Sequence, residues 1–158
     1  MRWRDLGVLT LTALTVVAVA APAASARPLP DGGVTAQEVA EVMRARKMPV
    51  ELTTDKDGDP LINSNASGRK FGVYFYQCKN KRCTAIQFSA GFQGAEDKAA
   101  RIAEWNRTKR FGRAYLDGAT VYVEMDMDME HGATTEAVAN NFERWAAVVE
   151  QFPKFVNQ

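Results

Sequence analysis

The sequence predicts an α+β domain in which helices pack on an antiparallel sheet, in the order α-β-β-β-β-α-β-β-α. Two strand pairs predict the sheet: Phe71 to Gln77 with Thr84 to Phe88, and Phe111 to Leu116 with Thr120 to Met129. Helical periodicity before, between and after these pairs predicts the helices. We expect residues 34–158 to form this single domain.

The N-terminus has the pattern of a secretory signal peptide. Two early arginines supply positive charge, Leu6 to Ala21 are mostly apolar, and Ala24-Ser25-Ala26 places small residues before a cleavage site. A retained anchor would need a longer uninterrupted apolar run. We therefore predict that residues 1–26 are removed, which leaves a periplasmic or secreted protein without a stable membrane anchor. Residues 27–33, rich in proline and glycine, are predicted to be a flexible leader.

The charges of the chain balance. The sequence has 20 Lys and Arg against 19 Asp and Glu, and the signal peptide takes away Arg2, Arg4 and Asp5. A neutral chain lacks the excess positive charge that attracts nucleic acid or an anionic membrane. Neither is expected as a partner.

The first helix is predicted to begin at Thr35, which can cap it, with Glu38 completing a capping box. Val34 can pack against Val39 at this end, and Met48-Pro49 is expected to end the helix.

Short strands follow. Val50 to Thr54 and Leu61-Ile62 are predicted to pair across a turn at Asp55 to Pro60, and Asn63 to Arg69 is predicted to be a second polar turn. It leads into the aromatic strand Phe71 to Gln77.

The two cysteines, Cys78 and Cys83, flank a polar loop between two predicted strands. Strands joined this way place the two residues opposite each other, and an oxidising compartment preserves disulfides, so we predict a bond that fixes the hairpin register. A redox-active pair is the alternative, although the C-x4-C spacing lacks the helix N-terminus that activates C-x-x-C thiols. Zinc lacks ligands, because His131 is the only histidine.

The second half is predicted to hold a helix over Ala95 to Thr108, a hairpin and a last helix. Asp117-Gly118 is the dipeptide favoured in a type I′ hairpin turn. Apolar residues from Val138 to Phe152 recur at spacings of three and four, which predicts an amphipathic helix from Thr135 that Pro153 stops.

One block is more specific than the rest: Trp105-Asn106, followed by Arg110-Phe111, Leu116-Asp117 and Glu124-Met125-Asp126. With these residues the mature chain resembles the YbjN family, whose members are labelled bacterial sensory transduction regulators. The resemblance implies a fold like that of type III secretion chaperones and no established enzymatic activity. The export signal departs from the cytoplasmic relatives.

Two acidic patterns could suggest a metal. Asp55, Asp57 and Asp59 match three positions of a calcium loop, but Pro60 replaces the required glycine and Ala66 the required glutamate, so ordinary turn chemistry is the better interpretation. No metal site and no cofactor are predicted.

From Glu124 to Glu130, carboxylates alternate with methionines, which places the two kinds of side chain on opposite faces of a strand. A solvated face over a methionine-lined core or groove is the favoured interpretation, and soft ligation of copper beside His131 is the alternative. A flexible methionine face could also accept an apolar peptide.

The basic residues around Trp105 and Phe111 are most simply explained by pairing of Arg110 or Arg113 with Glu124 or Asp126 across the hairpin. The tyrosines of the strand Phe71 to Gln77 indicate a central strand or a face that meets a partner. The residues predicted to bind a partner are Tyr74, Tyr76, Met125, Met127, Met129, Trp105, Arg110 and Phe111.

No nucleophile with a base and an orienting group is recognisable, so catalysis is not expected. The leading prediction is an exported, noncatalytic protein-interaction module, chaperone-like in shape, that binds a protein partner or forms a homodimer. The alternative is an envelope domain that senses a small ligand or a metal.

Overall fold

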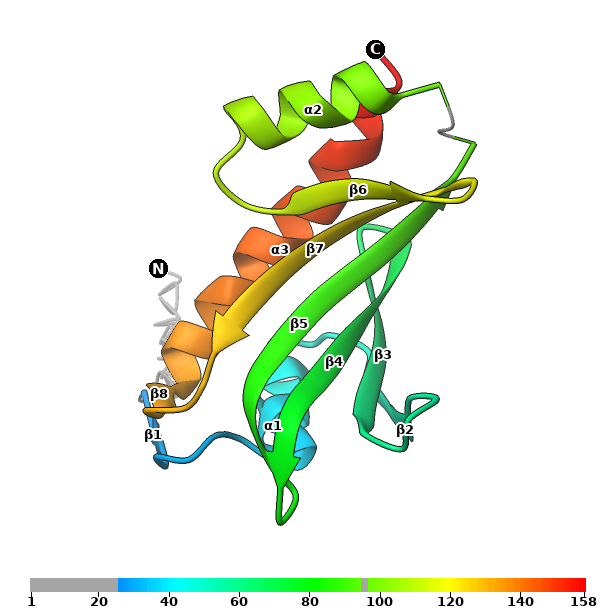
Figure 1. Cartoon of the computed structure of the whole chain (residues 1–158). Coiled ribbons are helices and arrows are strands. Elements are labelled where there is room, and N and C mark those ends of the chain that lie inside the picture. Colours follow the sequence, from blue (N-terminus) through cyan, green and yellow to red (C-terminus); the bar gives the residue numbers. More distant parts are fainter. Residues whose placement is uncertain (1–25, 95–96) are drawn as a thin grey trace, which may run out of the picture.

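The computed structural model describes residues 26–94 and 97–158, and it has the predicted α+β architecture. One antiparallel sheet of six strands, in the order β2-β3-β4-β5-β7-β6, carries the helices on one face (Figure 1). The elements are β1 (Pro28–Leu29), α1 (Ala36–Ala45), β2 (Glu51–Thr54), β3 (Pro60–Ala66), β4 (Arg69–Lys79), β5 (Arg82–Gln93), α2 (Ala99–Thr108), β6 (Arg113–Asp117), β7 (Thr120–Asp128), β8 (Ala133–Thr134) and α3 (Thr135–Val156).

The start of α1 confirms the predicted capping box: the Thr35 hydroxyl accepts from the Glu38 N–H, and the Glu38 carboxylate accepts from the Thr35 N–H. The helix ends at Ala45, before the expected stop at Met48-Pro49. Lys47 adopts a positive φ of 58°, and the Met48 N–H donates to the Met43 carbonyl. This Schellman-type end closes the helix without a glycine.

The strands β3, β4 and β5 are longer than predicted. Ala66 pairs with Arg69, so the turn expected over Asn63 to Arg69 shrinks to Ser67-Gly68, where both residues have positive φ. A two-residue turn of this conformation matches the twist of its strands, which lets pairing run up to the turn. The polar residues from Asn63 to Asn65, which were predicted to lie in a turn, therefore belong to β3.

The cysteine hairpin confirms the predicted disulfide. Cys78 and Cys83 are register partners on β4 and β5 and are bonded to each other. Lys79 pairs with Arg82, so the loop is the two residues Asn80-Lys81, both at positive φ, rather than four. This is the backbone that a type I′ hairpin turn requires.

The last hairpin also differs in detail. Asp117 pairs with Thr120, so the turn is Gly118-Ala119, one residue later than predicted. Only Gly118 has positive φ (58°), whereas type I′ requires it at both positions. The pairing of Asp117 with Thr120 therefore decided the position of the turn, and the preference of Asp-Gly for the two turn positions of type I′ did not.

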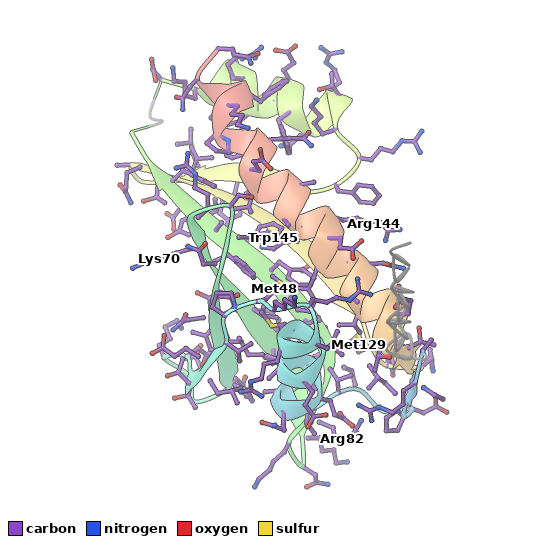
Figure 2. All side chains as sticks on the ribbon, turned by 180° about the vertical axis from the view of Figure 1, so that it is seen from behind. Met48, Lys70, Arg82, Met129, Arg144 and Trp145 are labelled. Atoms are coloured by element: carbon purple, nitrogen blue, oxygen red, sulfur yellow. A yellow bond between two sulfur atoms is a disulfide. The ribbon has the colours of Figure 1, made fainter. Side chains whose placement is uncertain are left out.

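Helix α3 does not stop at Pro153 but continues to Val156. Proline removes one backbone hydrogen bond, but Phe152, Pro153 and Val156 are all buried, and that burial outweighs the loss. The core lies between α1, α3 and the sheet, and Trp145 of α3 is buried in it (Figure 2). The Trp145 ring stacks on Phe88, and Phe142 meets Phe88 edge to face.

The segment predicted to be a flexible leader packs onto the domain. Strand β1 pairs with β8, Leu29 is buried, and the Gly32 N–H donates to the Glu130 carbonyl. Burial of Leu29 and pairing of the backbone outweigh the flexibility that the prolines and glycines suggested. The predicted signal peptide lies outside the described residues except for Ala26. Within residues 26–94 and 97–158, no helix is long and apolar enough to cross a membrane.

Candidate functional site

Among residues 26–94 and 97–158, no helix covers one of the two faces of the six-stranded sheet. Figure 1 shows α1 and α3 on the far side of the sheet, so the near face is open. Alternation along the strands sends Val73, Phe88 and Val123 to the helix-covered face and their neighbours to the other. We call this other side the open sheet face; its central residues are Leu61, Asn63, Gly72, Tyr74, Tyr76, Gln87, Ser89, Gly91, Arg113, Tyr115, Tyr122, Glu124 and Asp126.

Two glycines make room for tyrosines on the open sheet face. A Cβ atom on Gly72 would come within 2.7 Å of the Tyr74 ring, and one on Gly91 within 3.2 Å of the Tyr122 ring. The rings therefore lie across the backbone of the glycines. Between them is a hollow of about 660 Å³, whose lining includes Tyr74, Tyr122, Asn63, Lys70 and Glu51.

Glu124 is the polar centre of this face. Its carboxylate accepts hydrogen bonds from the Tyr115 hydroxyl (2.8 Å), the Ser89 hydroxyl (3.4 Å) and the Arg113 guanidinium (2.7 Å). The side chain is only 9% exposed, so these partners replace water around a buried charge. The predicted pairing of Arg113 with Glu124 across the hairpin is thereby confirmed.

The surroundings of Tyr115 shift its ionisation. Burial, the hydrogen bond to Glu124 and the negative charge of Glu124 raise the pKa of Tyr115 to about 12. The ring also stacks on Tyr122, with centroids 5.6 Å apart. Tyr115 is thus held neutral and in one orientation.

A second chain of hydrogen bonds crosses three neighbouring strands. The Tyr76 hydroxyl donates a hydrogen bond to the Gln87 side-chain oxygen (3.3 Å), and the Gln87 side-chain NH2 donates one to the Asp126 carboxylate (2.9 Å). Burial, together with the charge of Glu124, raises the pKa of Tyr76. The open sheet face is therefore a polar surface with aromatic rings, ordered by hydrogen bonds, and not a continuous hydrophobic surface.

The residues predicted to bind a partner separate into three places. Tyr74 and Tyr76 lie on the open sheet face, as a partner surface would need. Met125 and Met127 of β7 point to the helix-covered side, where Met125 is buried and Met127 packs against the core. Met129, directly after β7, is buried as well. The alternation of carboxylates and methionines along β7 was predicted correctly. The methionine side of the strand, however, belongs to the core and is not available to a partner.

Trp105 is buried as well, and its contacts stabilise the fold and leave no surface for a partner. Its indole N–H donates to the Gly112 carbonyl (2.6 Å), and the adjacent Asn106 amide bonds both the carbonyl and the N–H of Ala114 (2.8 and 2.9 Å). The Trp-Asn pair thus ties α2 to the edge strand β6 and satisfies backbone groups that the sheet leaves open.

Arg110 and Phe111 are exposed, in the loop between α2 and β6. Phe111 is 46% exposed, and the guanidinium of Arg144 from α3 lies over its ring. Gly112 next to it packs against Val148 of α3. This loop therefore belongs to the helix side of the molecule, away from the open sheet face.

Sequence reasoning predicted that Arg113 pairs with Glu124, but it missed the hydrogen bonds of Tyr115 and Ser89 to the same carboxylate and the role of Asn106. The hairpin register could have shown the cluster, because pairing around Asp117 and Thr120 places Tyr115 beside Tyr122 and Arg113 beside Glu124. Asn106 carries no such signal, because its partner Ala114 lies in another element.

The acidic turn after β2 shows ordinary turn chemistry. The Asp55 carboxylate accepts from the N–H groups of Asp57 and Asp59 (2.9 and 3.0 Å). Across the part of the chain that the structure describes, no group of three or more His, Cys, Asp or Glu side chains is arranged to hold a metal ion. His131, the only histidine in the sequence, is exposed between β7 and β8.

These features define an α+β domain with an open, hydrogen-bonded sheet face, closed by a disulfide hairpin at one end. The family model described as "YbjN: Putative bacterial sensory transduction regulator" matches residues 35–157. The chain belongs to the YbjN family, as its tryptophan-asparagine block predicted. No curated protein and no solved structure matches the chain.

Proposed function

We propose that this chain is an exported, noncatalytic interaction module of the YbjN family that binds a protein surface with its open sheet face. One observation carries the proposal: within the described part of the chain, one face of the six-stranded sheet carries no helix, and that face presents tyrosines held in place by hydrogen bonds. Tyrosine is enriched in protein interfaces because its rigid ring gives contact area and its hydroxyl stays hydrogen-bonded.

Two features support export. The N-terminal sequence has the parts of a cleavable signal, and the bond between Cys78 and Cys83 is of a kind that persists outside the cytoplasm. The family description names a regulator and no reaction, which agrees with a binding role.

The first partner to test is a second copy of the chain. Tyr76 and Tyr115 are 40% and 37% exposed, and they are among the few large hydrophobic side chains on the surface of the described residues. A twofold interface would cover both copies of this face at once, which is how most homodimers form. A chaperone-like module would use the same face for a partner segment.

Sedimentation velocity on the protein purified from the periplasm of an expression host tests the proposal. A dimer is expected for the wild type and a monomer for Tyr74→Lys/Tyr76→Lys. The matched control is Leu52→Lys, because Leu52 is 42% exposed but lies on the other side of the edge strand β2. A wild-type monomer, or a dimer that the double variant leaves intact, would contradict self-association through this face.

The hollow on the open sheet face supports a second candidate, a domain that senses a small ligand. Its volume of about 660 Å³ is in the range of small-molecule sites, and its tyrosines and amides could stack on and hydrogen-bond a polar ring. Native mass spectrometry of the purified protein would reveal such a ligand as an adduct that Tyr74→Ala/Tyr122→Ala removes.

A further inference from the structure

A cluster of positive charge surrounds an exposed aromatic ring at the end of the molecule formed by α2 and α3. Arg107, Lys109 and Arg110 come from the end of α2 and the loop after it, and Arg144 comes from α3. Together with Phe111 they form what we call the basic-aromatic patch. Figure 2 shows Arg144 on the outer side of α3, away from the buried Trp145.

Within the described residues, the cations of the basic-aromatic patch have no acidic partner. Among residues 26–94 and 97–158, none of the four makes an ion pair, whereas nearby Arg101 pairs with Glu104 and Arg113 with Glu124. Arg113, expected in the same cluster, turns instead to the open sheet face. The positive charge that remains is available to something outside the chain.

The patch is preorganised by contacts with aromatic rings. The Lys109 ammonium lies 5.3 Å from the Phe155 centroid and 5.8 Å from that of Trp105, and the Arg144 guanidinium lies 5.3 Å from that of Phe111. Cations stacked this way keep their hydrogen-bonding edges free while the rings hold their position. Little side-chain freedom would be lost on binding.

A small hollow lies among these groups. Its volume is about 170 Å³, which suits one apolar side chain. Its lining combines the apolar residues Trp105, Phe111, Ala147 and Val148 with Lys109, Arg110, Arg144 and Gln151. No carboxylate from the described part of the chain lines it. The chemistry is therefore apolar at the floor and positive at the rim.

From this arrangement we infer that the basic-aromatic patch binds an acidic polypeptide segment, one that inserts an apolar side chain and places carboxylates on either side of it. The charges are spread around an apolar floor rather than aimed at one point, which fits an extended segment better than a single small anion. The patch lies on the helix side of the domain, so this binding does not depend on the function proposed for the open sheet face.

Fluorescence anisotropy with a labelled peptide tests the inference, using a central leucine with glutamates on both sides. We expect binding to the full mature protein, weaker binding as sodium chloride is added, and a loss of about tenfold or more for Arg110→Glu/Arg144→Glu. The matched control Arg44→Glu/Lys79→Glu changes the net charge equally at exposed sites elsewhere and should bind as the wild type does. Phe111→Ser should weaken binding as well.

Further measurements distinguish an acidic peptide from other ligands of the basic-aromatic patch. Replacement of the peptide's leucine by glycine should weaken binding, and replacement of its glutamates by lysine should abolish it. The inference is overturned if the glutamate peptide does not bind, if the control variant loses as much affinity, or if inorganic phosphate competes as well as the peptide. Binding of phosphatidylglycerol vesicles without binding of the peptide would overturn it in favour of a membrane contact. Circular dichroism of each variant verifies that it is folded.

Discussion

Asn106 shows how much one side chain can do at a sheet edge. Its amide bonds the N–H and the carbonyl of Ala114 as a neighbouring strand would, so β6 is an edge strand whose middle is already occupied. Trp105 anchors the same loop from the adjacent position. The most recognisable dipeptide of the sequence therefore has a structural task and not a binding one.

Replacement of Asn106 by alanine is expected to destabilise the fold by about 1–3 kcal/mol, because two buried backbone groups of Ala114 lose their partners. Urea unfolding followed by tryptophan fluorescence measures the change. Asn140→Ala, at an exposed position of α3, is the matched control and should be nearly neutral. Equal stabilities of the two variants would contradict the role of Asn106.

Tyr115 is expected to make the stability of the domain fall at high pH. Its pKa is about 12 in the folded state against the usual 10, so the folded protein holds this proton more tightly. The resulting stabilisation is complete below pH 10 and is lost as the pH rises toward about 12. Urea unfolding across this pH range should show the difference between wild type and Tyr115→Phe narrowing. A difference that stays constant would rule out the proton linkage.

At the scale of elements, the hairpin of β4 and β5 organises one end of the domain. Its disulfide joins register partners next to a two-residue turn, and Cys83 also exchanges backbone hydrogen bonds with Val34 before α1. The Arg82 guanidinium reaches the Gly33 carbonyl and the Glu38 carboxylate, which ties α1 to the same hairpin. Burial alone would raise the pKa of Glu38, but the hydrogen bond from the Thr35 N–H and the charge of Arg82 together lower it.

Removal of the disulfide in Cys78→Ala/Cys83→Ala should cost about 2 kcal/mol, since the closed loop is short. The wild type should lose the same amount in dithiothreitol, and the double variant should not respond to it. Unfolding curves with and without reductant make the comparison. A double variant that remains sensitive to reductant would show that the effect has another origin.

At the scale of the whole molecule, the arrangement separates two surfaces. The open sheet face presents tyrosines and a buried glutamate network, while the basic-aromatic patch lies on the side of the helices. A module with two such surfaces can bind two partners at the same time. If both proposals hold, the chain can connect one binding event to another, as the family description of a regulator requires.

Export is testable on the same scale. The mass of the protein recovered from the periplasm of an expression host should equal that of the chain beginning at Arg27, less two hydrogens for the disulfide. Reduction should restore those hydrogens. A protein that keeps residues 1–26 would contradict cleavage of the signal.

The accuracy of prediction from the sequence differs from element to element. Local signals were sufficient for the capping box at Thr35 and Glu38 and for the pairing of Cys78 with Cys83, because their partners lie within a few residues. Turn positions shifted where strand pairing competed with dipeptide preference, as at Gly118-Ala119. Met125 was assigned to the correct face of its strand, but that the helices cover this face depends on residues far away in the chain.

By itself, then, the sequence determined the order of the elements, the alternation of β7, the disulfide and the family, since each depends on short-range periodicity or on a local motif. Tertiary structure decided which side of the sheet stays open, that Asn106 closes an edge, and that Arg144 joins Phe111 in one patch. These are contacts between segments distant in sequence. They depend on packing of the whole core, which no local pattern encodes.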